Sequence, residues 1–327
     1  MATAQQLKAL IQSFAEGDDD RFLAISMQMA SHAARKGQGK LADELRQLVD
    51  QAKLRQHSAT PRQPVPIMRA RGELAGLLSV NYPKLRLADM VLAEEQQTQL
   101  QRIALEYRQQ HRLRARNLSA RRKLLLVGPP GSGKTMTASA LAGELGLPLL
   151  VVQLHGLITK FMGETAAKLR MVFDAMDQTR GIYLFDEFDA IGGHRDLNND
   201  VGEIRRVLNS FLQFLEQDQS DSFILAATNH AKMLDRALYR RFDDCLRYHH
   251  PNAALARQLI ENRLASFGTS HLKWKEVLPN AKGLSYAEIA RACDDAARSA
   301  ILDESEQVTS EALKVALKER RCFHHSA

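Results

Sequence analysis

The sequence lacks the features that mark several common classes of protein. No run of apolar residues approaches the length of about 18 that a membrane-spanning helix needs, so we expect no membrane span. The N-terminus does not combine a basic start with an apolar run, and we therefore expect no secretory leader. Neither a CxxC pair nor an HExxH motif occurs, which argues against a zinc site.

Cysteine is scarce as well. The three cysteines, Cys245, Cys293 and Cys322, lie far apart in the sequence. An odd number of widely spaced cysteines does not indicate a disulfide framework. A reducing environment fits this pattern, and we expect the protein to be cytoplasmic.

Length and composition indicate an ordinary globular protein. The 327 residues are 45% apolar and 25% charged. A chain of this length can form one large domain or two to three smaller ones, and it can bury a sizeable core.

The formal net charge of +7 is unevenly distributed. Residues 53–123 carry 15 Lys and Arg against five Asp and Glu, so the rest of the chain is slightly acidic. Such a basic stretch can bind nucleic acid or an acidic protein. It can also be a solvated linker and helix face, which is the commoner role of a charged run and the one we favour.

The N-terminal part reads as a separate helical unit. Apolar residues recur at helical spacing within residues 1–55, and breaks at 17–20 and 37–40 suggest three helices. This module can serve packing and oligomerisation or bind an adaptor, and the pattern does not separate these roles. Residues 56–84 follow as a basic linker, with three prolines within 56–71.

Residues 85–250 show a different pattern, in which short apolar runs alternate with helical segments. The expected strands are 124–128, 148–154, 181–186 and 222–229. Strands alternating with helices predict an α/β fold, a three-layer parallel sheet covered on both faces. Residues 251–327 return to a helical pattern, near 252–266, 285–303 and 309–320, which predicts a separate helical lid.

The strongest motif is GPPGSGKT at 128–135, which follows an apolar strand and opens a helical segment. This is the context of a phosphate-binding loop, in which glycines let backbone N–H groups surround phosphate oxygens. Lys134 would neutralise the β- and γ-phosphates of ATP, and the Thr135 hydroxyl would bind Mg²⁺. The expected nucleotide-binding residues are Gly128, Pro129, Pro130, Gly131, Ser132, Gly133, Lys134, Thr135, Met136 and Asp186.

A second motif places two acids at the end of an apolar strand, at Asp186 and Glu187. Ligands of parallel sheets bind at the carboxyl ends of the strands. Asp186 would hold Mg²⁺ through water, and Glu187 would orient and deprotonate the attacking water.

Four motifs follow one another along the chain: GPPGSGKT, YLFDEFD, LAATNH and LDRALYRRFDD. Their order and spacing resemble those of the AAA+ ATPases, and in particular the AAA proper group, which includes katanin, spastin and FtsH-like motors. The resemblance covers about 85–320. The resemblance implies a P-loop NTPase fold with a helical lid. It also makes Asn229 the sensor of the γ-phosphate or attacking water.

Further roles follow from the same resemblance. Arg240 and Arg241 match the arginine fingers that reach the nucleotide of a neighbouring subunit, which implies a homo-oligomeric ring, usually a hexamer. Phe161, Met162 and Gly163 match the first pore loop, which grips a translocating polypeptide, and 192–202 would be the second. The segment GLSYAEIARA at 283–292 is similar to the sensor 2 region, but Tyr286 and Glu288 replace the usual Gly and Asp.

Three functions remain open. The first is an ATP-hydrolysing ring motor that remodels or unfolds a protein client. The second is a nucleotide-gated, antitoxin-like regulator of a partner protease, because the layout resembles bacterial stand-alone ATPases encoded beside subtilisin-like serine proteases. The third is a nucleic-acid-directed loader, which the basic stretch at 53–123 motivates and which we favour least.

Overall fold

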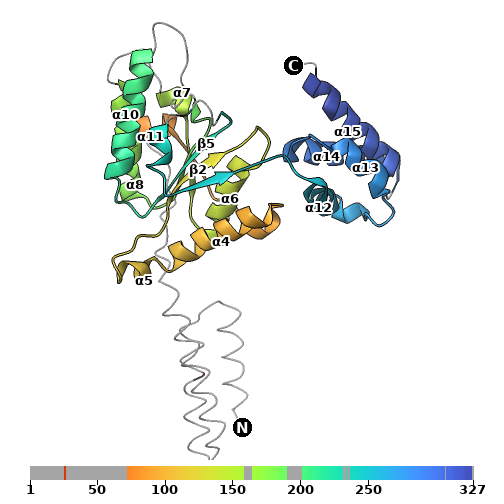
Figure 1. Cartoon of the computed structure of the whole chain (residues 1–327), viewed down its shortest axis with the longest axis horizontal. Helices are drawn as coiled ribbons and strands as arrows, with labels where there is room; N and C mark the ends of the chain where they lie inside the picture. Colours follow the sequence, from red (N-terminus) through yellow and green to blue (C-terminus); the bar gives the residue numbers. More distant parts are fainter. Residues whose placement is uncertain are drawn as a thin grey trace, which may run out of the picture. The chain divides into compact units, whose positions relative to one another are not determined.

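The computed structural model describes Ser26 and residues 72–157, 164–189, 201–230, 234, 236–305 and 307–325 (Figure 1). The chain divides into two compact units, Met1–Pro64 and Val65–Ala327. The helical module expected at 1–55 therefore lies outside the described residues apart from Ser26. No helix in the described part of the chain has both the length and the apolar character to cross a membrane.

A six-stranded sheet forms the centre of the second unit, with strand order β1-β3-β4-β5-β2-β6. The strands are β1 (Leu78–Asn81), β2 (Lys123–Val127), β3 (Leu149–Val152), β4 (Ile182–Phe185), β5 (Phe223–Thr228) and β6 (Asp244–Arg247). All neighbours are parallel except β1, which is antiparallel to β3. Every residue of β4 and β5 is buried, as apolar strands covered on both faces should be.

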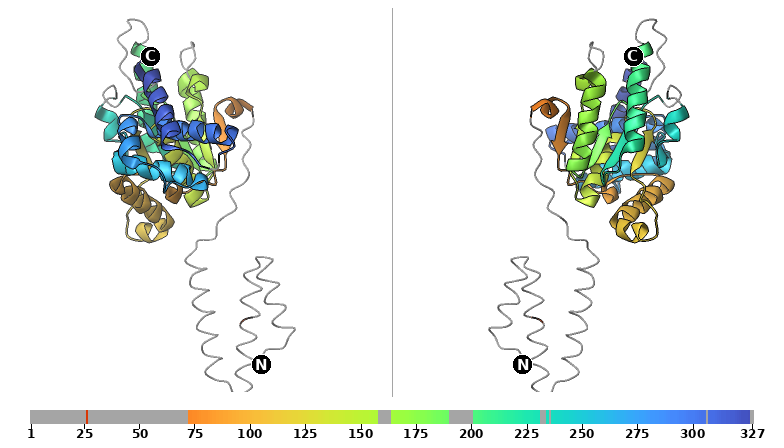
Figure 2. Two further views of the ribbon diagram at one scale, coloured as in Figure 1. Left: turned by 90° about the vertical axis from the view of Figure 1, so that its right-hand side faces the viewer. Right: turned by 90° about the vertical axis from the view of Figure 1, so that its left-hand side faces the viewer.

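Helices cover both faces of this sheet, which confirms the expected three-layer α/β fold (Figure 1). One face packs against α7 (Leu154–Leu157), α8 (Glu164–Gln178), α10 (Val201–Gln217) and α11 (Arg236–Tyr239). The other packs against η2 (Leu87–Asp89), α4 (Glu94–Arg108) and α6 (Lys134–Leu145), and α5 (Gln110–Arg114) follows α4. Figure 2 shows α8 and α10 side by side on their face of the sheet.

Two strands were not expected from the sequence. The short turn η1 (Gly72–Gly76) and β1 lie within 56–84, which the sequence analysis assigned to a linker. That assignment is wrong for β1, because Leu78–Asn81 pairs along its whole length with Leu149–Val152. Both β1 and β6 stand at the sheet edges and mix polar with apolar residues, so neither carries the apolar run of a central strand.

The lid is a helical cluster with its own core. It contains α12 (Ala253–Arg263), η4 (Ala265–Phe267), α13 (Trp274–Ala281), α14 (Tyr286–Leu302) and α15 (Ser310–His325). The three expected helical segments correspond to α12, α14 and α15. The sequence pattern missed α13, because it has only eight residues and contains Pro279.

One glycine marks how closely α6 approaches the chain before α4. A Cβ atom at Gly143 would lie 2.0 Å from the Leu85 carbonyl oxygen and 3.0 Å from that of Pro83. These are backbone atoms, so a side chain at this position would force the two segments apart.

We expect Gly143→Ala to lower the free energy of unfolding by about 1–3 kcal/mol, the usual cost of overpacking. Urea denaturation would measure the change. Gly76→Ala is the matched control, because no atom lies within 4 Å of the added Cβ, and its effect should stay within about 0.5 kcal/mol. Equal stability of the two variants would contradict the close approach.

Candidate functional site

The motif GPPGSGKT forms the loop between β2 and α6. The Gly128 N–H donates to the Thr228 carbonyl at 3.2 Å, so the loop begins beside the end of β5. Gly131 and Gly133 have φ angles of 70° and 98°, which L side chains rarely adopt. Lys134 is the first residue of α6, so the loop ends at a helix N-terminus, where backbone N–H groups commonly bind phosphate.

The Lys134 ammonium is buried in this loop. The side chain is only 6% exposed, and its Nζ donates to the Gly128 and Pro129 carbonyls, both at 2.8 Å, and to Asn229 Oδ1 at 2.7 Å. Burial lowers the pKa of Lys134, while Asp186 and Asp189 act in the opposite direction. A phosphate oxygen that binds this ammonium has to replace one of the three acceptors, since an ammonium has three donors.

Thr135 and the two acids meet beside it. The Thr135 hydroxyl donates to Asp186 Oδ2 at 2.6 Å, and the Glu187 N–H donates to Asp186 Oδ1 at 2.9 Å. Glu187 has a φ of 52°, an uncommon conformation for a residue other than glycine, and its side chain is exposed. We call Lys134, Thr135, Asp186 and Asn229 the Lys134 cluster.

The donor set of this cluster suits a magnesium nucleotide. A hydroxyl and a carboxylate are the hard oxygen ligands that Mg²⁺ prefers. The described residues hold no group of three or more His, Cys, Asp and Glu that could bind a metal by itself, so phosphate oxygens would have to complete the shell. The buried Ser132 hydroxyl in the loop has no hydrogen-bond partner among the described residues, which leaves a polar group for a ligand to satisfy.

Asn229 is held by residues around it. Asp189 Oδ1 accepts from the Thr228 hydroxyl at 3.0 Å and from the Asn229 N–H at 3.4 Å. Thr228 Oγ1 in turn accepts from the His230 N–H at 3.0 Å. This chain of bonds fixes the turn after β5 and directs the Asn229 side chain to Lys134. Sequence analysis gave Asp189 no role, although it belongs to the motif YLFDEFD.

The lid touches the phosphate loop directly. The Ala287 N–H donates to the Gly131 carbonyl at 3.1 Å, and a Cβ on Gly131 would lie 2.6 Å from Ser285 Oγ. Ser285 and Glu288 form a capping box at the start of α14, with N–H to side-chain distances of 2.7 and 3.3 Å. The Glu288 that departs from the family pattern thus caps this helix, and Ser-x-x-Glu was a signal that could have been found in the sequence.

One further contact near the loop could not be predicted. Tyr248, 2% exposed, donates its N–H to the Val127 carbonyl at 2.7 Å, and its hydroxyl lies 2.8 Å from Thr137 Oγ1. A single Tyr carries no motif, so only the folded structure brings this side chain to the loop. Met90, from the segment before α4, also lies near the loop: its methyl group is 3.7 Å from where a Cβ of Gly133 would be.

Arg240 and Arg241 lie at the other end of the strands. They precede β6, which is parallel to β2 and begins with Asp244 opposite Leu124. The phosphate loop instead follows the carboxyl end of β2, and a strand of five residues is about 16 Å long. Both arginines are exposed, and within the described part of the chain neither bonds to the Lys134 cluster.

Most of the remaining expected site residues lie outside the described part of the chain. Phe161, Met162 and Gly163 lie outside the described residues, as does nearly all of 192–202. Met136 is described, and its side chain is 43% exposed at the start of α6.

Comparison with known proteins gives consistent results. Residues 124–249 match the family described as "ATPase family associated with various cellular activities (AAA)". An uncharacterized AAA family ATPase of Sinorhizobium fredii, y4kL, is 33% identical over 98% of this chain and 96% of its own length. The ATP-dependent zinc metalloprotease FtsH 1 of Methylacidiphilum infernorum is 33% identical, but the match spans 68% of this chain and only 36% of that protein.

Structural comparison adds the fold. The crystal structure of the FIGL-1 AAA domain superposes with a TM-score of 0.60 at 24% identity, covering 74% of this chain and 85% of that one.

A further sequence relative is a putative 26S proteasome regulatory subunit homolog of Methanothermobacter marburgensis, which is 30% identical over 62% of this chain and 55% of its own length.

We expect Lys134→Met to weaken ATP binding by about ten- to hundredfold, because charge-assisted hydrogen bonds are worth about 1.5–3 kcal/mol. A fluorescent ATP analogue would measure the dissociation constant. Lys168→Met is the control, since Lys168 also donates to a backbone carbonyl, Gly156 O, but on α8. Unchanged binding in Lys134→Met, with a native melting profile, would remove the ammonium from nucleotide recognition.

Proposed function

This chain belongs to the AAA family of ATPases and hydrolyses ATP, and from that premise we propose that it is one subunit of a hexameric ring that remodels or unfolds proteins. The observation that carries the proposal is the Lys134 cluster, in which the phosphate loop, the strand-end carboxylate and the polar residue after β5 are joined by hydrogen bonds. AAA ATPases generally assemble into rings and act on protein clients, which supports the choice.

Within this proposal each residue of the site has a distinct task. Lys134 binds the β- and γ-phosphates of ATP, and Thr135 and, through water, Asp186 would hold Mg²⁺, which would neutralise phosphate charge. Glu187 accepts a proton from the attacking water as the water oxygen bonds to the γ-phosphorus and the bond from that phosphorus to the bridging oxygen breaks, which leaves ADP and phosphate. Asn229 orients that water, and its contact with Lys134 supports this position.

The position of the arginines supports a ring. Arg240 and Arg241 are exposed at the amino ends of β2 and β6, about a strand's length from the phosphate loop of the same chain. A guanidinium there is placed to stabilise the transferring phosphoryl group of a neighbouring subunit. The hexamer and the first pore loop, with Phe161, Met162 and Gly163, rest on the family resemblance and stay predictions, as does the cytoplasmic location.

The structure favours the solvated interpretation of the basic stretch over nucleic-acid binding. Several of its arginines form ion pairs with acids of the same chain: Arg108–Glu144, Arg114–Asp221, Arg121–Glu106, Arg121–Asp244 and Arg122–Asp218. A guanidinium engaged in this way is less available to a phosphate backbone. The regulator of a partner protease remains a compatible alternative, because it would use the same ATPase site together with 1–55.

We expect Glu187→Gln to bind ATP with near-normal affinity and to reduce kcat by about a hundredfold or more, the usual contribution of a general base. Phosphate release and nucleotide titration would separate the two effects. Glu95→Gln removes an exposed acid on α4 and should leave both values unchanged. Normal turnover by Glu187→Gln would exclude Glu187 as the base.

The ATP-bound Glu187→Gln protein should also retain the client, which pull-down and mass spectrometry would identify. With that client, we expect Phe161→Ala to abolish processing while ATP hydrolysis without client persists, because the aromatic ring grips the polypeptide rather than the nucleotide. Tyr82→Ala, which removes an exposed aromatic side chain outside the expected pore loop, is the control. Equal client processing by Phe161→Ala and the parent protein would reject the pore-loop role.

A further inference from the structure

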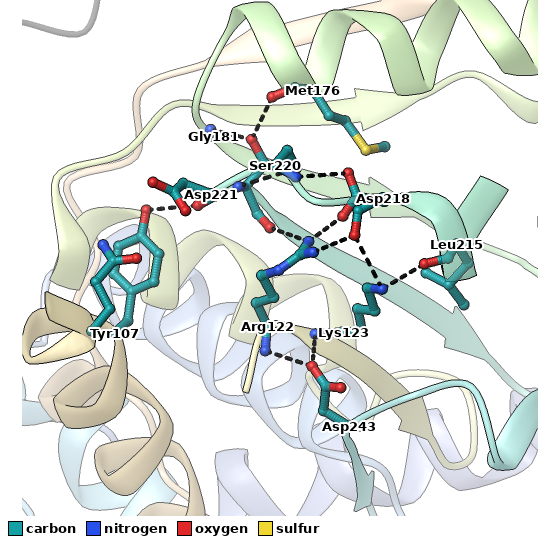
Figure 3. A network of polar contacts seen from close by, with 12 residues as sticks. Tyr107, Arg122, Lys123, Met176, Gly181, Leu215, Asp218, Ser220, Asp221 and Asp243 are labelled. Carbon is teal, nitrogen blue, oxygen red and sulfur yellow. Dashed lines mark hydrogen bonds and ion pairs between the residues drawn. The ribbon is translucent and has the colours of Figure 1, made fainter. Parts of the chain in front are cut away.

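The last turn of α10 is held by basic residues from the start of β2 (Figure 3). The Lys123 ammonium donates to the Leu215 carbonyl at 2.5 Å, and the Arg122 guanidinium donates to the Asp218 carbonyl at 2.7 Å. These carbonyls belong to the end of the helix, where backbone acceptors have no partner within the helix. Two cations at a helix C-terminus are also favoured by the helix dipole.

Much of this contact is buried. Arg122 forms an ion pair with the Asp218 carboxylate, and their side chains are 17% and 2% exposed. Burial also lowers the pKa of the Lys123 ammonium. Removing one partner of a buried pair leaves an uncompensated charge, so the end of α10 is strongly tied to β2.

The same two residues hold the segment that carries the arginines. Asp243 Oδ2 accepts from the Arg122 and Lys123 N–H groups, both at 2.9 Å, and the Asp243 N–H donates to the Lys123 carbonyl at 2.8 Å. Figure 3 shows Asp243 below Arg122 and Lys123, opposite the acceptors from α10. Asp243 lies two residues after Arg241, and Phe242 between them is buried.

The Arg241 side chain also reaches α10. Its Nε pairs with Glu216, which lies in the same last turn, between Leu215 and Asp218. Pairing through Nε leaves the two terminal nitrogens of the guanidinium for another acceptor. Both side chains are about half exposed, so solvent screens the pair, and Glu216 only weakly offsets the attraction between Arg241 and a phosphate at its terminal nitrogens.

We propose that Glu216 is a positioning residue for Arg241, which it holds on the partly buried anchor formed by Arg122, Lys123, Asp218 and Asp243. The inference rests on the proposed role of Arg241 at the nucleotide of a neighbouring subunit. An arginine side chain is long and loses much rotational freedom when it is ordered. Glu216 orders the Arg241 side chain before it contacts the phosphoryl group, so less conformational entropy is lost when the transition state forms.

The test compares Glu216→Ala and Glu216→Gln with the parent protein, in the full chain at concentrations where assembly is complete for every variant. We expect Glu216→Ala to lower kcat for ATP hydrolysis by about two- to tenfold, the cost of ordering one long side chain. KM for ATP should stay unchanged. The kcat of Glu216→Gln, which keeps an acceptor oxygen, should lie between that of Glu216→Ala and that of the parent protein.

Asp221→Ala is the matched control. It breaks a comparably exposed ion pair, Arg114–Asp221, near the same end of the sheet without touching Arg241. Its kcat should equal that of the parent protein. An equal loss in Glu216→Ala and Asp221→Ala, an unchanged kcat in Glu216→Ala, or an increase would each overturn the positioning role.

Arg241→Ala and the double variant with Glu216→Ala separate this inference from the proposed function. If Glu216 acts through Arg241, the second substitution should cause no further loss once Arg241 is gone. A full additional loss would show that Glu216 acts elsewhere, and it would overturn the positioning role alone. If Arg241→Ala leaves kcat unchanged, the assignment of Arg241 fails, and the role of Glu216 fails with it.

Discussion

The buried ammonium of Lys134 is the constraint on which the site depends. A cation that is only 6% exposed is tolerated because three oxygens surround it, two from the phosphate loop and one from Asn229. This requirement ties the loop after β2 to the turn after β5. The hydrogen bond between Asp189 and Thr228 also stabilises that turn. The Lys134 ammonium therefore links the carboxyl ends of the neighbouring strands β2 and β5.

The strand β2 connects this site to a second group of charges, which is partly buried. At its carboxyl end it leads into the phosphate loop, and at its amino end Arg122 and Lys123 bind the end of α10 and Asp243. The residue expected to act on a neighbour, Arg241, is therefore held at the opposite end of the strand that carries the chain's own phosphate loop. This separation is what a site shared between adjacent subunits requires, because an arginine that could reach its own nucleotide would not need a ring.

The lid is linked to the same loop by a short backbone contact. The start of α14 meets Gly131 through the Ala287 N–H and Ser285, and it is kept in shape by the capping box with Glu288. The helix start therefore lies directly against the phosphate loop. The departure from the family pattern at Glu288 thus has a structural explanation.

The sequence by itself determined the α/β class, the four buried central strands and the motifs of the phosphate loop and strand-end acids, because each is encoded in a local run with its own period or spacing. It did not determine the edge strands β1 and β6, which mix polar and apolar residues, or α13, which has only eight residues. Nor did it determine the parts played by Asp189, Tyr248 and Glu216. Their partners, Thr228, Thr137 and Arg241, are 25 to 111 residues away in the chain. Contacts of this kind leave no local pattern, because only the folding of the sheet and its helices brings the partners within bonding distance.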